Sequence, residues 1–279
     1  MKERPVDLIN ILCGAFASCL RELFDNGSGL FAGVDYVLHL ALVPAVRIWA
    51  VGMNAGLGGI PRPNDLPKAE ALGPDSDRVL ILGPGPALGR GVNTHQLALP
   101  GALARALTAM TGRGTEVDVI TNPSFDIRNM GDAVDVASLW QFDAIVLTPG
   151  VTDILAFTSI HVWERHLTLL LAKLGVVAPK MELFVAGIPP VRSIPGFDTP
   201  MGGLVGRHAQ SINDVSLAVC SGLSKATFVP LSALPKRSDG RLRAPRDYCL
   251  WGQELAVIIA PILDAGWLAA GGIDESWPR

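Results

Sequence analysis

The stretch of this sequence best suited to chemistry is a glycine-rich loop that follows a short apolar run. Residues 79–82 predict a buried strand, and glycines stand directly after it at positions 83, 85, 89 and 91. Glycine lets the backbone approach a ligand closely, and a helix N-terminus after such a loop favours anions. In a doubly wound α/β sheet, this loop lies at the carboxyl edge of the strands, where such folds bind ligands. We therefore expect the functional site at this loop.

Dinucleotide binding is one chemistry that the loop allows. From position 85 onward its glycines reproduce the G-x-x-x-G-x-G spacing of short-chain dehydrogenases. That reaction also needs a tyrosine with a lysine four residues later. The two tyrosines, Tyr36 and Tyr248, are followed at that offset by Leu40 and Gly252. The catalytic pair is therefore missing, and we expect no cofactor.

A second resemblance covers more of the sequence, from residue 78 to about 265. The glycine loop resembles the first block of the SGNH (GDSL-type) esterase and lipase family, Gly-Asp-Ser-x-x-x-Gly-x-Gly. The glycines that match this block are Gly83, Gly89 and Gly91. Pro84 stands at the family's aspartate, and Gly85 stands at its nucleophilic serine. Because glycine has no side chain, the resemblance implies that no acyl-enzyme forms here.

The family's next two blocks supply donors to the oxyanion. The glycine of the second block falls on Phe125, beside Ser124, and a phenylalanine there is expected to crowd the tetrahedral intermediate. The third block, Gly-x-Asn-Asp, is matched from Gly150, with Thr152 in place of the asparagine and Asp153 retained. A threonine hydroxyl has a shorter reach than an amide. The resemblance thus implies a weakened oxyanion hole.

The family's last block, Asp-Gly-x-His-Pro, carries the catalytic acid and base. Tyr248 and Trp251 match the Gly-Tyr-x-x-Trp that follows it, and this register places Asp239 on the acid and Leu242 on the histidine. Leucine cannot take up a proton. The altered signature positions are Gly85, Phe125, Thr152 and Leu242. Their joint alteration predicts a pseudoenzyme.

We therefore expect a catalytically inactive pseudo-esterase that binds a lipid or acyl ligand, or a protein partner, at the altered pocket. The expected binding residues are Pro84, Gly85, Ser124, Phe125, Thr152, Asp153 and Leu242. One alternative is an active esterase, lipase or acyltransferase-like enzyme with relocated machinery. Its candidate groups are Ser124, Asp126, Asp153 and His208. Another alternative is a purely structural interaction subunit whose pocket is filled.

Several of these residues also have purely structural interpretations. Gly85 could serve a positive φ angle, Asp153 could cap the next segment, and Trp251 could belong to the core.

Composition limits the possible partners. The sequence is 49% hydrophobic and 18% charged over 279 residues, which favours contact of one part with a membrane or a partner. A net charge of −3, without a basic face interleaved with aromatic residues, argues against nucleic acid. The four cysteines and five histidines are scattered, so we expect free thiols in a reducing, cytoplasmic compartment and no metal.

The segment before the glycine loop differs from the rest. Residues 6–24 predict an amphipathic helix, and residues 34–51 are apolar but interrupted by charges and a proline. We expect residues 6–55 to hold the protein at a membrane surface or a protein partner, as a peripheral membrane protein. The alternative is that these helices cover the main domain or pack against a second copy in a homo-oligomer. Residues 56–74, rich in glycine and proline, predict a linker.

The remainder alternates strands and helices, which predicts an α/β fold. The expected strands are 79–82, 116–121, 144–148, 183–188 and 228–231, and the expected helices are 94–111 and 159–174. Ser159 is expected to cap the second of these helices. We predict a three-layer α/β/α sandwich with a parallel sheet, SGNH-hydrolase-like and flavodoxin-like. The expected division is N-terminal helices and linker at 1–72, the SGNH-like domain at 73–266, and a tail at 267–279.

Overall fold

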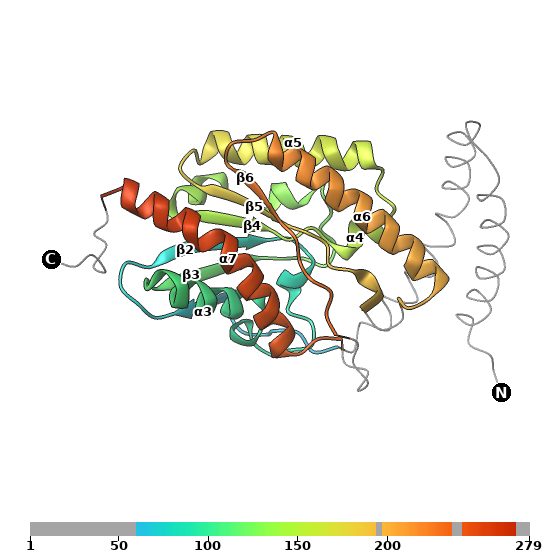
Figure 1. Cartoon of the computed structure of the whole chain (residues 1–279), viewed down its shortest axis with the longest axis horizontal. Helices are drawn as coiled ribbons and strands as arrows, with labels where there is room; N and C mark the ends of the chain where they lie inside the picture. Colours follow the sequence, from blue (N-terminus) through green and yellow to red (C-terminus); the bar gives the residue numbers. More distant parts are fainter. Residues whose placement is uncertain (1–59, 194–196, 236–241, 272–279) are drawn as a thin grey trace.

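The computed structural model describes residues 60–193, 197–235 and 242–271. Within these residues, six strands form one sheet in the order β1-β3-β2-β4-β5-β6 (Figure 1). The strands are β1 (Lys68–Ala71), β2 (Asp77–Leu82), β3 (Thr115–Ile120), β4 (Ala144–Leu147), β5 (Glu182–Ala186) and β6 (Ala226–Val229). Strands β2 to β6 run parallel, whereas β1 pairs antiparallel with β3.

Helices cover both faces of this sheet. The α-helices are α3 (Leu99–Thr111), α4 (Val151–Leu155), α5 (Ile160–Val177), α6 (Pro200–Ser221) and α7 (Pro245–Ala269). The short 3₁₀ helices are η1 (Pro86–Leu88), η2 (His95–Leu97), η3 (Met130–Ala133), η4 (Val136–Gln141) and η5 (Val191–Ser193). Figure 1 shows α5 and α6 on one face and α3 and α7 on the other. The three-layer α/β/α prediction is confirmed.

The strands divide their side chains between two cores. In β4, Ile145 and Leu147 enter the core beneath α5 and α6, whereas Ala144 and Val146 enter the core beneath α3 and α7. Successive side chains of a strand point to opposite faces, so a strand covered on both sides is apolar throughout. This explains why the central strands read as continuous apolar runs in the sequence.

Helices α3 and α7 approach each other closely at Gly252. A Cβ atom at Gly252 would lie 2.8 Å from the carbonyl carbon of Ala102 in α3. Only a glycine allows this backbone approach. Trp251 and Tyr248, on the same stretch of α7, are fully buried. The interpretation of Trp251 as a core residue is thus confirmed, and α7 belongs to the body of the domain.

The prediction for the helix at 159–174 is confirmed and extended. The hydroxyl oxygen of Ser159 accepts a hydrogen bond from the backbone N–H of Val162, and α5 continues to Val177. The helix expected at 94–111 is corrected: η2 and α3 replace it, with a break at Ala98. Leu97 and Met110, two large apolar side chains of this stretch, are 44% and 45% exposed.

Two sheet predictions need correction. The sheet is mixed rather than wholly parallel, because β1 pairs antiparallel with β3 along the edge. This strand lies inside the stretch expected to be a linker at 56–74. Its ladder and the ion pair between Lys68 and Glu116 at 2.8 Å hold it in place. The last expected strand, 228–231, is observed as β6 two residues earlier.

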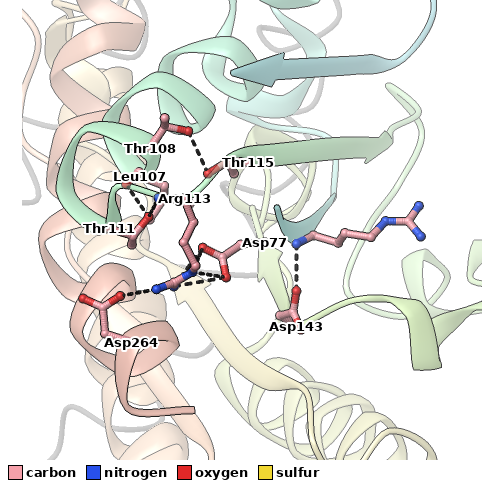
Figure 2. A network of polar contacts seen from close by, with 9 residues as sticks. Asp77, Leu107, Thr108, Thr111, Arg113, Thr115, Asp143 and Asp264 are labelled. Carbon is pink, nitrogen blue, oxygen red and sulfur yellow. Dashed lines mark hydrogen bonds and ion pairs between the residues drawn. The ribbon is translucent and has the colours of Figure 1, made fainter. Parts of the chain in front are cut away.

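A buried ionic network joins the sheet to the layer formed by α3 and α7, at the amino edge of the sheet and opposite the glycine loop (Figure 2). The guanidinium of Arg113, which follows α3, donates to the carboxylate of Asp77 at the start of β2 over 2.9 to 3.2 Å. It also donates to Asp264 of α7 at 2.7 Å and stacks over the ring of Trp267. Arg113 therefore ties α7 to the end of the sheet.

The predictions for residues 6–24, 34–51 and 6–55, for Asp239 and for most of the tail lie outside the described residues. Among the described helices, α7 alone is long and apolar enough to cross a membrane by length and composition. This is weak support for membrane contact, because the core helix of a soluble protein passes the same test. Its face toward α3 lies in the core.

Candidate functional site

The glycine loop begins where β2 ends, between the carboxyl ends of β3 and β4. The backbone N–H of Gly83 donates to the carbonyl oxygen of Ile120 in β3 at 3.1 Å. Gly83 has a φ of 138°, and a Cβ atom there would collide with the carbonyl oxygen of Thr148 after β4. Only glycine fits both constraints. The loop is thus held tightly against both neighbouring strands.

Gly85, at the family's nucleophile position, lies over the segment that follows β4. Its φ is −64°, so the interpretation that it serves a positive φ is wrong. A Cβ atom there would lie 3.0 Å from the carbonyl oxygen of Pro149, a tight contact. Pro84, at the family's aspartate position, packs so closely on Gly150 that no side chain fits at 150. The loop and the 149–150 segment are therefore in direct contact.

The turn at Phe125 uses its own polar groups. The backbone N–H of Phe125, at the position expected to donate to an oxyanion, donates to the carbonyl oxygen of Asn122 at 3.0 Å. The N–H and hydroxyl of Ser124 both donate to the side-chain oxygen of Asn122, at 2.9 and 2.7 Å. The half-buried ring of Phe125 packs against the core beneath α5 and α6. The backbone N–H of Phe125 and the hydroxyl of Ser124 therefore both form hydrogen bonds within the turn.

Thr152 and Asp153, in the first turn of α4, hold the same loop in place. The hydroxyl of Thr152 donates to the carbonyl oxygen of Pro123 at 3.3 Å. Asp153 is 1% exposed and accepts hydrogen bonds from the N–H of Ile127, at 3.2 and 3.3 Å, and from the hydroxyl of Thr158, at 3.1 Å. The N-cap of α4 is Gly150 and the N-cap of the next helix, α5, is Ser159, so the interpretation of Asp153 as a cap of the next segment is wrong.

Burial raises the pKa of Asp153 to about 6, against the hydrogen bonds from Ile127 and Thr158, which lower it. A carboxyl group removed from water favours its neutral form. The buried carboxyl group of Asp153 therefore links α4 to the 122–129 loop through its hydrogen bonds with Ile127.

The family's last block adjoins the glycine loop. Gly91 has a φ of 98°, and a Cβ atom there would collide with the carbonyl oxygen of Arg243, which follows Leu242. The hydroxyl of Tyr248 donates to the carbonyl oxygen of Arg90 at 2.8 Å. Leu242 is half-buried at this junction. The glycine loop around Gly85 contacts residues 149–150, which lead directly into the helical turn that carries Thr152. Leu242 lies beside the same loop because the next residue, Arg243, contacts Gly91.

Among the contacts between the described parts of the chain, none joins two of the alternative catalytic groups. His208 of α6 is buried and stacks on the ring of Phe157, with centroids 4.8 Å apart. The hydroxyl of Ser124 donates to Asn122, and Asp126 accepts from the N–H groups of Arg128 and Asn129. Within the described ranges, no group of three or more His, Cys, Asp or Glu residues is placed to hold a metal ion.

Sequence reasoning missed a strap formed by residues 61–67, which crosses the glycine loop. The N–H of Gly91 donates to the carbonyl oxygen of Pro61 at 2.8 Å, and Pro63 lies against Gly89. Asp65 accepts hydrogen bonds from both the backbone N–H and the ring Nδ1 of His95, the latter at 2.6 Å. The glycines and prolines of this stretch predict a linker, so no sequence signal distinguishes the strap.

This arrangement defines an α/β fold in which a glycine loop, the 122–129 loop, the start of α4 and the segment before α7 meet at the carboxyl edge of the sheet. Solved structures with a similar fold include carbohydrate esterases and a lipase. A carbohydrate esterase family 2 enzyme with a carbohydrate binding domain, from Corynascus thermopiles, matches with a TM-score of 0.54 and 16% identity, over 69% of this chain and 68% of that one.

Two shorter solved structures match over nearly their whole length. Est24, a carbohydrate acetylesterase from Sinorhizobium meliloti, has a TM-score of 0.50 and 14% identity, over 67% of this chain and 99% of its own. The lipase Lip_vut3 from a goat rumen metagenome has a TM-score of 0.50 and 11% identity, over 65% and 96%. Several longer carbohydrate esterases are matched over 64% or 65% of their own length, so this chain spans somewhat less than two thirds of them.

No protein-family model matches this chain, and no curated protein matches it in sequence. The resemblance to SGNH/GDSL-type hydrolases is confirmed as a likeness of fold, because the structural neighbours include carbohydrate esterases and a lipase. At these identities the likeness fixes the fold and leaves the chemistry to the residues of the site.

Proposed function

We propose that this protein is a catalytically silent SGNH-like domain that serves as a lipid- or partner-binding subunit. The observation that carries the proposal is the internal hydrogen bonding at the expected oxyanion hole. The N–H of Phe125 donates to Asn122, and the hydroxyl of Thr152 donates to Pro123. An oxyanion hole needs donors that point at the developing charge and are not already engaged.

The nucleophile position supports the same proposal. Gly85 offers no side chain, and a new side chain there would press on the carbonyl oxygen of Pro149. Leu242, in the expected register, offers no base. A site that lacks a nucleophile, a base and free donors cannot catalyse ester hydrolysis, so the function we propose for it is the binding of a ligand or a protein partner.

A covalent probe tests the missing nucleophile directly. Incubating the full chain with an alkyl fluorophosphonate and measuring the intact mass should give no adduct, because no activated hydroxyl lies at position 85. A stoichiometric adduct that maps to Ser124 would instead favour the alternative of an enzyme with relocated machinery.

We also propose that residues 6–55 hold the protein at the cytoplasmic face of a membrane or at a protein partner. The support is the apolar, amphipathic character of this segment in the sequence. Deleting residues 1–55 should move the protein from the membrane pellet to the supernatant after cell fractionation. Fractionation that the deletion leaves unchanged would contradict the membrane anchor.

A purely structural interaction subunit is the second candidate function. The close packing of Pro84 on Gly150 favours it, because this contact closes the space between the glycine loop and α4. Soaking crystals of the protein with a short fatty acid separates the two candidates. An acyl chain bound beside Gly85 supports a lipid-binding subunit, and an unchanged pocket supports a structural one.

A further inference from the structure

Three arginines converge at the rim of the glycine loop from three separate segments. Arg90 lies within the loop, between Gly89 and Gly91. The strap places Arg62 there, because Pro61 bonds to Gly91 and Pro63 packs on Gly89. Arg243 lies in the segment before α7, and its backbone carbonyl oxygen is in close contact with Gly91. Contacts to two neighbouring glycines thus bring three positive charges together.

Arg243 is the buried member of this group. It is 6% exposed, and its guanidinium stacks over the ring of Trp251 at 4.9 Å. Its described polar contact is with the neutral hydroxyl of Tyr248. None of the ion pairs between described residues includes Arg243. A buried charge without an opposite charge is costly, so the site gains from an anion that arrives from outside.

The charges at the rim act on one another. Burial lowers the pKa of Arg90, and the positive charges of Arg62 and Arg243 lower it further. Two acids on the neighbouring described segments are engaged elsewhere: Asp65 bonds to His95, and Asp247 accepts from the N–H of Ala244 at 2.7 Å and lies 4.0 Å from Arg246. The whole chain has a net charge of −3, so general basicity does not explain this cluster.

We infer that Arg62, Arg90 and Arg243 form an anion site for a phosphate group, carried by a lipid headgroup or by a soluble phosphate ester. Planar guanidinium groups bind phosphate oxygens in pairs, and a stacked, buried arginine is already positioned to do so. This inference rests on the proposed function for placing the ligand at this rim. It does not depend on the absence of catalysis.

Inorganic phosphate is the first probe. Thermal unfolding of the full chain is followed as sodium phosphate replaces sodium chloride at constant ionic strength. Phosphate should raise the Tm of the unmodified protein. Arg90→Gln should weaken the apparent phosphate affinity about tenfold and Arg62→Gln about threefold, since a charge-assisted hydrogen bond to phosphate is lost in each.

Arg165→Gln, at an exposed position on α5, is the matched control and should bind phosphate as the unmodified protein does. Arg243→Lys keeps the charge but loses the planar fork, so it should also weaken binding. Because Arg62 and Arg90 are less buried than Arg243, the test does not depend on the folding of an Arg243 variant. Equal stabilisation of all variants by phosphate, or none at all, would overturn the inference.

Vesicle flotation separates the two sources of phosphate. Vesicles of phosphatidylcholine with phosphatidylglycerol are compared with phosphatidylcholine alone. Flotation that needs phosphatidylglycerol and falls in Arg62→Gln and Arg90→Gln supports a lipid headgroup. Flotation unaffected by these changes, with phosphate binding still dependent on them, supports a soluble ester. Arginine-dependent binding of duplex DNA without binding of phosphate contradicts the inference in favour of nucleic acid.

The outcome is distinguishable from failure of the proposed function. Ester hydrolysis with arginine-dependent phosphate binding refutes the silent domain and leaves the anion site intact. Absence of ester hydrolysis together with absence of phosphate binding refutes the anion site and leaves the proposed silent domain intact.

Discussion

The backbone nitrogen of Phe125 lies 3.0 Å from the carbonyl oxygen of Asn122 and donates its hydrogen bond there. In the alignment with the SGNH family, this nitrogen is the donor expected for the oxyanion. Hydrogen bonds from Thr152 to Pro123 and from Ile127 to Asp153 fix this turn to α4. A single loop therefore combines the expected catalytic position with a structural hydrogen-bond network.

Stability should depend on pH through Asp153. Its pKa in the folded protein, about 6, is above the value near 3.8 of an exposed aspartate, so the folded state binds the proton more tightly than the unfolded state. Stability should therefore fall as pH rises from 4 to 6 and level off above. With each pKa unit equivalent to about 1.4 kcal/mol, the loss attributable to Asp153 is about 3 kcal/mol.

This contribution is isolated by comparison with Asp153→Asn in urea unfolding from pH 4 to pH 7. The free energy of unfolding of the asparagine variant should lack this part of the fall. Asp132→Asn, at an exposed position in η3, should keep the pH profile of the unmodified protein. Identical profiles for Asp153→Asn and the unmodified protein would show that Asp153 does not titrate in this range.

Loss of Arg113 should destabilise the domain strongly without touching the glycine loop. Arg113→Ala leaves Asp77 buried without its partner, which should cost about 3 to 5 kcal/mol in the free energy of unfolding. Asp264→Asn, which alters the more exposed partner, should cost less than about 1 kcal/mol. Urea unfolding measures both, and similar losses for the two variants would contradict this account of the network.

Two glycines of the loop should respond differently to alanine. Gly91→Ala places a Cβ atom against the carbonyl of Arg243 at a φ of 98°, which should cost about 2 kcal/mol or more. Gly85→Ala meets only the tighter 3.0 Å contact with Pro149 and should cost about 1 kcal/mol. The measurement is the free energy of unfolding, and a larger loss for Gly85→Ala would reverse the assignment of the strained position.

Much of the fold could be predicted from the sequence because its signals are local. Ser159 caps α5 as its position before an apolar helix indicates, and Trp163 and Leu167 occupy the buried stripe. Helix α6 was missed because glycines in its first turns resemble a loop. Strand β1 was missed because its short, charged sequence depends on pairing with β3.

The site was less predictable because its decisive contacts join distant segments. The alignment located Gly85 and Thr152, but the sequence does not reveal that Thr152 donates to Pro123. The convergence of Arg62, Arg90 and Arg243 also depends on three loops that meet only in the folded chain. Spacing along the sequence carries no information about such contacts.

Restoring the family's residues should restore chemistry only when all are restored together. The combined change Gly85→Ser, Phe125→Gly, Thr152→Asn and Leu242→His should give measurable ester turnover, because these groups act as a unit. Gly85→Ser alone should remain silent, since its hydroxyl lacks a base. Adding Asp239→Asn to the combined variant should reduce turnover again. Turnover that is the same with and without Asp239 would contradict the proposed register of the last block.

The most direct test of the silent site is the steady-state hydrolysis of p-nitrophenyl acetate by the unmodified full chain. The rate should equal that of buffer without protein, and Ser124→Ala and Asp153→Ala should leave it at that level, because no activated nucleophile or free oxyanion donor lies at the altered positions. Robust hydrolysis by the unmodified protein, above the buffer rate and proportional to protein concentration, would contradict the account. Loss of that activity in Ser124→Ala would identify the relocated nucleophile.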